Sequence, residues 1–239
     1  VRSHGLHYAS SVFEGERSYN KKVFKEEEHT NRLINSAQSR GFDLPYNTDE
    51  IMNLRKMVMD ANNISDGYIR PVAWRGSERM GISAQSNTIH CALAAWEWPS
   101  YFSPEAKFKG IKLNISKWKR PDPSTAPVNT KAAGLYMICT LSKHEAESQG
   151  YDDSLMLDYR GYVAEATGAN IFFVKDEELH TPIADCFLNG ITRQTIITIA
   201  RENGIIVHEK RIKLEDLKDY SECFVTGTAA EVTPVNQIA

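Results

Sequence analysis

The 239-residue sequence lacks the local motifs that mark several common enzyme classes. It contains no Gly-x-Gly-x-x-Gly, no Walker loop, no His-Glu-x-x-His and no Gly-x-Ser-x-Gly. Dinucleotide binding, nucleotide hydrolysis, zinc proteolysis and serine hydrolysis therefore lack support. Cysteine is scarce, and Cys91, Cys139, Cys186 and Cys223 lie far apart, mostly beside apolar residues. This pattern predicts reduced, buried thiols, with neither a redox Cys-x-x-Cys nor a metal site.

Basic clusters and long apolar runs are absent too. The net charge is −3 and the pI about 6.2, and no basic stretch alternates with aromatic residues. Nucleic acid and membranes are therefore not expected partners, and small molecules become the default ligands. No apolar run reaches the length of a membrane span, and no signal peptide is recognisable. We expect a cytoplasmic protein.

What is present is an alternation of strands and helices typical of an α/β or α+β protein of two domains. We expect a small domain over 1–95, truncated at its start, and a large domain over 103–239. The connection 96–102 is rich in aromatic residues, so it either lines a ligand site or packs at the domain joint. Pro71 predicts an edge or an end for the strand 68–74. The acidic run 26–28 indicates a solvated turn. Expected strands are 12–19 with 23–24, 68–74, 88–95, 111–118, 154–158, 170–175 and 222–226; expected helices are 29–40, 47–61, 135–146 and 191–203.

Lys131 is the first candidate for chemistry. It precedes the small residues 132–134 and an amphipathic run from Leu135 through Ile138 and Leu141 to Ala146, which predicts a helix packed on a core. A cation near a helix N-terminus opposes the helix dipole by about 0.3–1 kcal/mol, so a desolvated or imine-bound lysine suits this place better than a charged one. A solvated surface lysine is the alternative.

Two stretches are suited to an anion. Gly190-Ile191-Thr192 opens a helix and offers free main-chain N–H groups with a hydroxyl, and the small residues 226–230 follow a strand. Together they suggest one anion bound twice, although Thr192 could be only a helix cap and Thr228 only a turn residue.

Four further residues have two interpretations each. Arg32 lies four residues after Glu28 and could be a surface ion pair. Tyr68 and Arg70 share one strand face, so a phenol and a guanidinium project together, either into a cavity or into solvent; Arg is suited to binding a carboxylate. Glu165 stands among small residues with few cations nearby in sequence, either as a turn carboxylate or as a partner for a group from elsewhere.

Taken in order, short segments along nearly the whole chain resemble the branched-chain amino-acid aminotransferases, which are class IV, fold-type IV pyridoxal 5′-phosphate enzymes. These segments are Ser11-Val12-Phe13-Glu14-Gly15, His29-x-x-Arg32-Leu33, Tyr68-Ile69-Arg70-Pro71, Thr130-Lys131-Ala132-Ala133-Gly134-x-Tyr136, Glu165-Ala166-x-Gly168-x-Asn170, Gly190-Ile191-Thr192-Arg193 and Gly227-Thr228-Ala229-Ala230-Glu231-Val232-Thr233-Pro234-Val235.

The resemblance implies a two-domain fold-type IV enzyme with the cofactor between the domains, and it assigns cofactor roles. Lys131 would form the Schiff base with pyridoxal 5′-phosphate and move the proton between the substrate α-carbon and C4′. Glu165 would pair with the pyridine nitrogen, and Tyr136 with the 3′-oxygen. The phosphate would be held by Arg32, Ile191, Thr192 and Thr228.

The resemblance also implies substrates: branched-chain L-amino acids (Leu, Ile, Val) and 2-oxoglutarate. The turn at Thr228 and Ala229 would bind the α-carboxylate, and Phe13, Tyr136 and Trp98 would wall the apolar side-chain pocket. Arg70, with Tyr8 and Tyr101, would bind the distal carboxylate of glutamate. Tyr68 would be a further substrate-binding residue. A homodimer with shared active sites is implied as well.

Departures from the family pattern keep alternatives open. Leu135 stands where many relatives have asparagine, and Ala169 where some have glutamate. The alternatives are a D-amino-acid or (R)-amine transaminase, an aminodeoxychorismate lyase, or a non-catalytic α/β binding protein.

Overall fold

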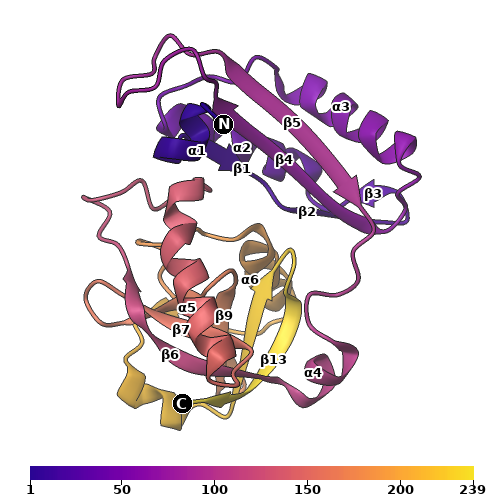
Figure 1. Cartoon of the computed structure of the whole chain (residues 1–239). Coiled ribbons are helices and arrows are strands. Elements are labelled where there is room, and N and C mark those ends of the chain that lie inside the picture. The colour runs from indigo at the N-terminus through magenta and orange to yellow at the C-terminus, as the bar shows by residue number, and fades with distance from the viewer. The chain divides into compact units, whose positions relative to one another are not determined.

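The computed structural model describes residues 1–239, which form two compact units (Figure 1). The first comprises Val1–Pro99 and Thr130–Tyr136, and the second comprises Ser100–Asn129 and Met137–Ala239. The chain first leaves the first unit at Pro99, inside the aromatic connection 96–102. The domain boundaries inferred from the sequence stay a prediction.

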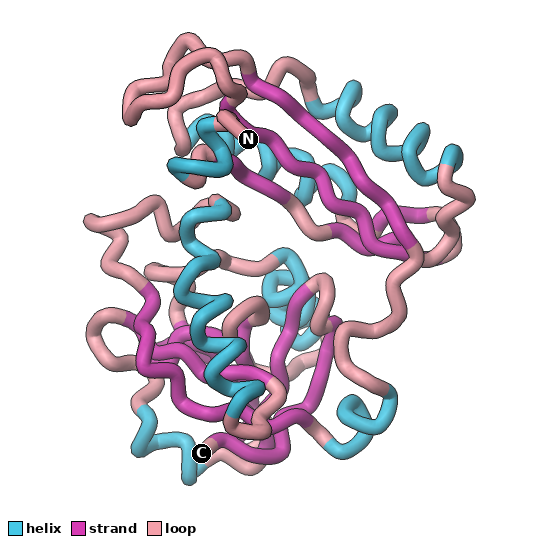
Figure 2. Tube along the Cα trace, in the orientation of Figure 1, coloured by secondary structure: helices cyan, strands magenta, loops and turns pink.

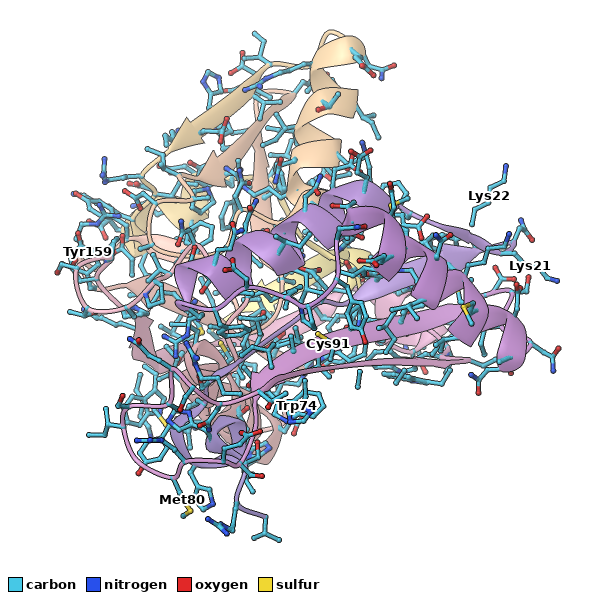
Figure 3. All side chains as sticks on the ribbon, turned by 90° about the horizontal axis from the view of Figure 1, so that it is seen from above. Lys21, Lys22, Trp74, Met80, Cys91 and Tyr159 are labelled. Atoms are coloured by element: carbon cyan, nitrogen blue, oxygen red, sulfur yellow. The ribbon has the colours of Figure 1, made fainter.

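The first unit contains a five-stranded antiparallel sheet of order β1-β4-β2-β3, with β5 paired to β4. Asn20 and Lys21 both have positive φ, at 49° and 65°, which gives the tight turn that joins β2 to β3. Figure 3 shows Lys21 and Lys22 projecting outward there. The turn expected between the strands 12–19 and 23–24 is confirmed, although 12–19 forms two strands. The five strands of this sheet are β1 (Ser11–Phe13), β2 (Glu16–Tyr19), β3 (Lys22–Val23), β4 (Gly67–Arg75) and β5 (Ile89–Trp96).

Pro71 lies in the middle of β4, so the edge position expected for it is wrong. On one side β4 pairs with β5, Pro71 opposite Leu93. On the other side β4 pairs first with β1 and then with β2, and the break between these short strands falls beside Pro71. There the Glu14 N–H donates to the Pro71 carbonyl at 2.9 Å. The missing proline N–H costs no ladder bond because the partner chain leaves the ladder at that point.

Three helices belong to the first unit: α1 (His4–Tyr8), α2 (Glu26–Ser39) and α3 (Thr48–Ala61). Asn47 and Glu50 form the capping box that their spacing predicts for α3. Figure 1 shows α3 running alongside β5. The acidic run expected to be a turn is instead the first turn of α2, where carboxylates favour the positive end of the helix dipole.

The buried face of α3 differs from the one expected. The sequence suggested an apolar face through Ile51, Leu54, Val58 and Ala61. Ile51 is buried as expected, Leu54 and Val58 are half-buried and Ala61 is exposed, while Arg55 and Met59 complete the buried face. Arg55 is fully buried because its guanidinium pairs with two carboxylates, at 2.5 Å from Glu16 and 2.9 Å from Glu26. A hydrophobic pattern cannot find a buried charge of this kind, because its burial depends on distant partners.

The second unit holds an eight-stranded mixed sheet of order β11-β10-β9-β12-β13-β6-β7-β8. The strand at the end of this order, β8, also contacts β9 and β10, so the sheet curls on itself. The core includes Ile111, Leu155 and Phe173. The strands are β6 (Ile111–Arg120), β7 (Asp153–Asp158), β8 (Val163–Ala166), β9 (Asn170–Lys175), β10 (Glu178–Pro182), β11 (Val207–Lys210), β12 (Glu222–Gly227) and β13 (Glu231–Ile238).

The helices of the second unit are α4 (Pro104–Lys109), α5 (Met137–Ser148), α6 (Ile191–Glu202) and the short η2 (Leu214–Asp219). Helix α5 packs on β6 and β7, and Figure 2 shows it crossing those strands. Cys139, Ser142 and Ala146 form its buried face, while Leu141, expected in the core, is 42% exposed. A serine occupies the core position because its hydroxyl bonds to Ser116 at 2.6 Å. No helix combines the length and the apolar character that crossing a membrane requires.

Candidate active site

Lys131 is anchored by its main chain in the first unit. Its carbonyl accepts the Phe13 N–H at 3.1 Å, its own N–H donates to the Ser36 hydroxyl at 3.1 Å, and the next residue, Ala132, bridges to Val12 of β1. The expectation that Lys131 lies near a helix N-terminus is confirmed, because the 3₁₀ turn η1 (Ala133–Tyr136) begins shortly after it and leads directly into α5. The α-helix itself begins at Met137, slightly later than the expected start at 135. Pairing with β1 keeps the lysine extended.

Aromatic rings surround the Lys131 amine. Its Nζ lies 2.8 Å from the Tyr136 hydroxyl oxygen and 4.9 Å from the centre of the Phe13 ring. The two rings are themselves 4.9 Å apart. A Cβ on Gly134 would come within 3.3 Å of the methyl group of Ala9, the residue that follows α1. The small residue at 134 therefore lets the segment that ends α1 approach closely. The structure thus places an amine on an aromatic wall.

Arg70 extends this wall along β4. Its guanidinium lies 4.5 Å from the centre of the Phe13 ring, and its Nη2 donates to the Tyr68 hydroxyl at 2.7 Å. The Tyr68 ring in turn contacts Trp98 edge-on, with 4.6 Å between centroids. The Nε of Arg70 is buried without a hydrogen-bond partner, and no carboxylate pairs with this guanidinium. A half-buried cation in this state is suited to an anionic ligand.

Glu14 is a buried carboxylate that binds two basic side chains. Arg32 donates to it through Nε at 2.6 Å and through Nη2 at 2.7 Å, and His29 donates through Nδ1 at 2.7 Å. Burial raises the pKa of Glu14, but the charge of Arg32 and the hydrogen bonds from His29 and Arg32 outweigh burial and lower it to about 2. Arg32, predicted to hold a phosphate, is thus fixed by an ionised partner and keeps Nη1 for another acceptor.

In the second unit, Glu165 lies on β8 and is 8% exposed, so it is not a turn residue. Arg120 of β6 approaches Glu165 Oε1 through Nε at 3.3 Å, and Asn170 of β9 donates to Oε2 at 3.1 Å. The expectation that this acid takes a partner from elsewhere is confirmed by Arg120. Sequence reasoning missed that arginine; its only signal is a cation at a strand end before Pro121.

Asn170 also connects this carboxylate to the start of α6. Its side-chain oxygen accepts the Gly190 N–H at 3.0 Å. A Cβ on Gly190 would fall 2.2 Å from that oxygen, so only glycine fits. No side chain caps the helix, which leaves the N–H groups of Ile191 and Thr192 at its positive end for an anion.

A turn of small residues follows β12. Thr228 and Ala229, predicted to bind phosphate and carboxylate groups, are both half-buried there. The hydroxyl of Thr226, two residues earlier, is buried and has no hydrogen-bond partner. This segment therefore offers hydroxyls and main-chain N–H groups in excess of what the fold itself uses.

Two predicted site residues pack elsewhere within their own units. Tyr8, at the end of α1, is 43% exposed and stacks on His4 at 4.6 Å, with no ring or hydrogen-bond contact to Arg70. Tyr101 packs edge-on against Phe102 at 5.0 Å, and the Lys143 amine lies 5.3 Å from its ring centre. The proposed substrate roles of both tyrosines stay predictions.

Comparison with known proteins identifies the family. The profile described as amino-transferase class IV matches residues 11–238. The chain belongs to the class IV aminotransferases. This aminotransferase is 52% identical to the probable branched-chain-amino-acid aminotransferase of Rickettsia conorii over 100% of this chain and 81% of the relative.

Solved structures agree with the fold of this class IV aminotransferase. The branched-chain amino acid aminotransferase of Escherichia coli superposes with a TM-score of 0.96 at 40% identity, covering 100% of this chain and 80% of that one. An aminotransferase from Brucella abortus bound to the cofactor pyridoxal 5′-phosphate gives a TM-score of 0.89 at 31% identity, covering 100% of this chain and 84% of that one. The fold-type IV prediction is confirmed.

Proposed function

We propose that this chain is a pyridoxal 5′-phosphate-dependent aminotransferase that moves the amino group reversibly between branched-chain L-amino acids (Leu, Ile, Val) and 2-oxoglutarate. Its membership of the class IV family and its similarity to branched-chain aminotransferases over 100% of this chain support the reaction. The observation that carries the proposal is the Lys131 amine, held by Tyr136 on an aromatic wall that also contains Arg70.

The donor groups of the chain fit this cofactor. A lysine amine suits its aldehyde carbon, and a buried carboxylate, Glu165, suits a protonated ring nitrogen. The uncapped start of α6 suits a phosphate. The buried Thr226 hydroxyl, which has no partner, lies in the strand that leads to the second anion-binding segment. Each of these parts of the cofactor therefore has a chemically suitable counterpart in the chain.

When bound, the cofactor supplies a carbonyl carbon that takes up the amino group and a ring that withdraws electrons from the substrate α-carbon. Lys131 would hold the cofactor through Nζ and, when that nitrogen is free, would move the proton of the substrate α-carbon. Tyr136, which bonds to Nζ, would orient the amine and hold the cofactor's phenolic oxygen. Glu165, fixed by Arg120 and Asn170, would hold the protonated ring nitrogen.

The phosphate would be held by Thr228, by the N–H groups of Ile191 and Thr192, and by Arg32. A charge-assisted hydrogen bond of this kind contributes about 1.5–3 kcal/mol. Glu14 contributes indirectly, because its two bonds fix the plane of the Arg32 guanidinium. The resemblance to branched-chain aminotransferases also assigns the substrate α-carboxylate to Thr228 and Ala229.

Substrate choice follows from the aromatic wall. Phe13, Tyr136 and Trp98 line an apolar side-chain pocket suited to leucine, isoleucine and valine. Arg70 binds the distal carboxylate of glutamate, with Tyr68 holding its Nη2 and Tyr8 and Tyr101 completing the contact. The same pocket then accepts an apolar chain against the rings or a carboxylate at the guanidinium.

We also propose a cytoplasmic homodimer whose partner subunits share residues between active sites. Light scattering over a dilution series, with activity measured on the same samples, tests this assembly. Activity per chain is expected to fall as the dimer dissociates. Full activity of a monomer contradicts shared sites.

Spectroscopy of the purified protein tests the function. A visible cofactor band that bleaches with L-leucine and returns with 2-oxoglutarate is the expected result. Bleaching by D-alanine alone would assign the chain to another fold-type IV activity, and no band after addition of pyridoxal 5′-phosphate would exclude a working transaminase. Arg70→Ala should keep the band and the reaction with L-leucine but lose the return step with 2-oxoglutarate.

A further inference from the structure

Two histidines and a glutamate meet on the outer strands of the second unit's sheet. Strands β10 and β11 pair in parallel, and their register places His180 directly opposite His208. Glu178 lies two residues before His180 on β10, so all three side chains stand on one face of the sheet. Their ligand atoms all lie within 4.8 Å of one another. None of them belongs to the proposed active site.

His180 is the residue that the fold alone does not explain. Its side chain is deeply buried, since only 6% of the residue is exposed, and neither ring nitrogen has a hydrogen-bond partner of normal geometry. The ring stacks on His208 with 4.7 Å between centroids and 14° between planes. Tyr220 contacts it edge-on at 5.3 Å. Buried imidazole nitrogens without partners are rare in folded proteins and indicate a missing ligand.

The other two residues open this group to solvent. His208 Nε2 lies 2.6 Å from Glu178 Oε2, and the two side chains are 42% and 33% exposed. An ion can therefore reach the group without any movement of the backbone. The exposed side chains can also rotate, whereas the buried His180 is fixed by the rings around it.

We propose that Glu178, His180 and His208 bind a divalent transition-metal ion, with Zn²⁺ the best fit, and that the ion links β10 to β11. Two imidazoles and one carboxylate form a common zinc ligand set, completed by water. Zn–N distances of about 2.0–2.1 Å place tetrahedral donors about 3.3 Å apart. His208 Nε2 and Glu178 Oε2, now 2.6 Å apart, must therefore separate slightly, so that the ion replaces their direct contact. Ligand atoms that lie farther apart, all within 4.8 Å, must draw together.

One cation lies beside the proposed ligands. Lys210 lies two residues after His208 on the same strand, with its amine 5.7 Å from the Tyr220 ring. This cation repels a metal ion, so removing it should strengthen binding.

A second group of possible ligands does not qualify. Asp158, Asp185 and Cys186 also lie close together, but Arg160 donates to both carboxylates at 2.7 Å, and Arg211 donates to Asp185 at 3.1 Å. These guanidinium groups already neutralise the charge that would attract a cation. The cluster of Glu178, His180 and His208 contains no arginine.

Isothermal titration calorimetry with ZnCl₂, carried out on the chelator-treated, cofactor-loaded protein, tests the site. We expect one ion per chain and a rise in melting temperature on binding. His208→Gln changes a half-exposed side chain and should leave the metal-free melting temperature unchanged while weakening Zn²⁺ at least about tenfold. Lys210→Gln should strengthen binding.

His144→Gln is the matched control, because His144 is a histidine on α5, outside the proposed metal site. Titration with CoCl₂ adds a spectroscopic readout, since the visible absorption of Co²⁺ reports its coordination geometry. Equal Zn²⁺ affinity in the original protein, His208→Gln and Glu178→Gln would overturn the proposal. Equal weakening by His144→Gln would do the same, because it would show binding to histidines in general.

Discussion

The amine of Lys131 lies 2.8 Å from the phenol oxygen of Tyr136, although the two residues are five positions apart. An α-helix would not bring such residues together, because its neighbouring positions are three and four apart. The extended backbone at Lys131 followed by the 3₁₀ turn η1 makes the contact possible. The 3₁₀ turn, which stands where an α-helical start at 135 was expected, therefore brings the phenol to the amine.

Tyr136→Phe should lower kcat by about 10- to 100-fold, because one charge-assisted hydrogen bond contributes about 1.5–3 kcal/mol. The ring and its packing on Phe13 are kept, so the melting temperature should change little, whereas loss of the bond to the 3′-oxygen should also weaken cofactor binding. Steady-state kinetics with L-leucine and a pH titration of the cofactor band measure the effect. An unchanged kcat and an unchanged titration would show that the phenol does not orient the amine.

Glu14→Gln should remove part of the acid sensitivity of the fold. The folded-state pKa of Glu14 is lowered from 4.5 to about 2, so its stabilisation is fully present above pH 4.5 and is lost as the pH falls toward 2. A shift of this size corresponds to on the order of 3 kcal/mol of unfolding free energy. Urea unfolding at pH 6 and pH 3 should show a smaller pH dependence in the variant.

Glu28→Gln is the control for this experiment, because Glu28 is 49% exposed and pairs only with Lys25. It should change the unfolding free energy by less than about 1 kcal/mol. Parallel pH profiles for the original protein and Glu14→Gln would contradict the role given to Glu14.

Gly190→Ala should weaken cofactor binding more than it weakens the fold. The new methyl group would fall 2.2 Å from the side-chain oxygen of Asn170, and displacing Asn170 removes a hydrogen bond to Glu165. The dissociation constant of pyridoxal 5′-phosphate, measured by fluorescence, should rise. Gly168→Ala is the control, since no atom lies within 4 Å of the position that its new methyl group would take; an equal effect of both variants would contradict the prediction.

Arg120→Gln should destabilise the protein by about 3–5 kcal/mol, because it leaves the buried Glu165 carboxylate without its cation. Lys117→Gln, on the same strand, removes a pair at 3.1 Å whose lysine is 65% exposed and should cost less than about 1 kcal/mol. Chemical unfolding of both variants measures the difference. Similar values for the two would show that Arg120 does not stabilise Glu165.

The sequence predicted those helices and strands whose ends are set by neighbouring residues in the chain. The capping box of α3 at Asn47 and Glu50, and the turn between β2 and β3, depend on neighbouring residues only. Strand β8 gave no such signal, because Val163–Ala166 consists mainly of small residues with weak strand preference. It is a strand because it pairs with β7 and, where the sheet curls, also contacts β9.

The candidate site divides in the same way. Tyr68 and Arg70 could be paired from strand alternation alone, and the structure shows their hydrogen bond. The anchors of Arg32 and Glu165 could not be found, because Glu14 and Arg120 reach them through tertiary packing. His180 and His208 give no spacing signal for the same reason, since only strand register brings them together.

The long sequence separation of the contacts around Lys131 has a consequence for folding during synthesis. The first unit gains its bond from the Lys131 N–H to Ser36 across 95 residues, so most of the unit leaves the ribosome well before the segment Thr130–Tyr136 that completes it. Until then β1 has no partner for the bridge at Val12. The nascent first unit therefore keeps an unpaired strand edge until Thr130–Tyr136 has been synthesised, which is the kind of exposed edge that chaperones protect.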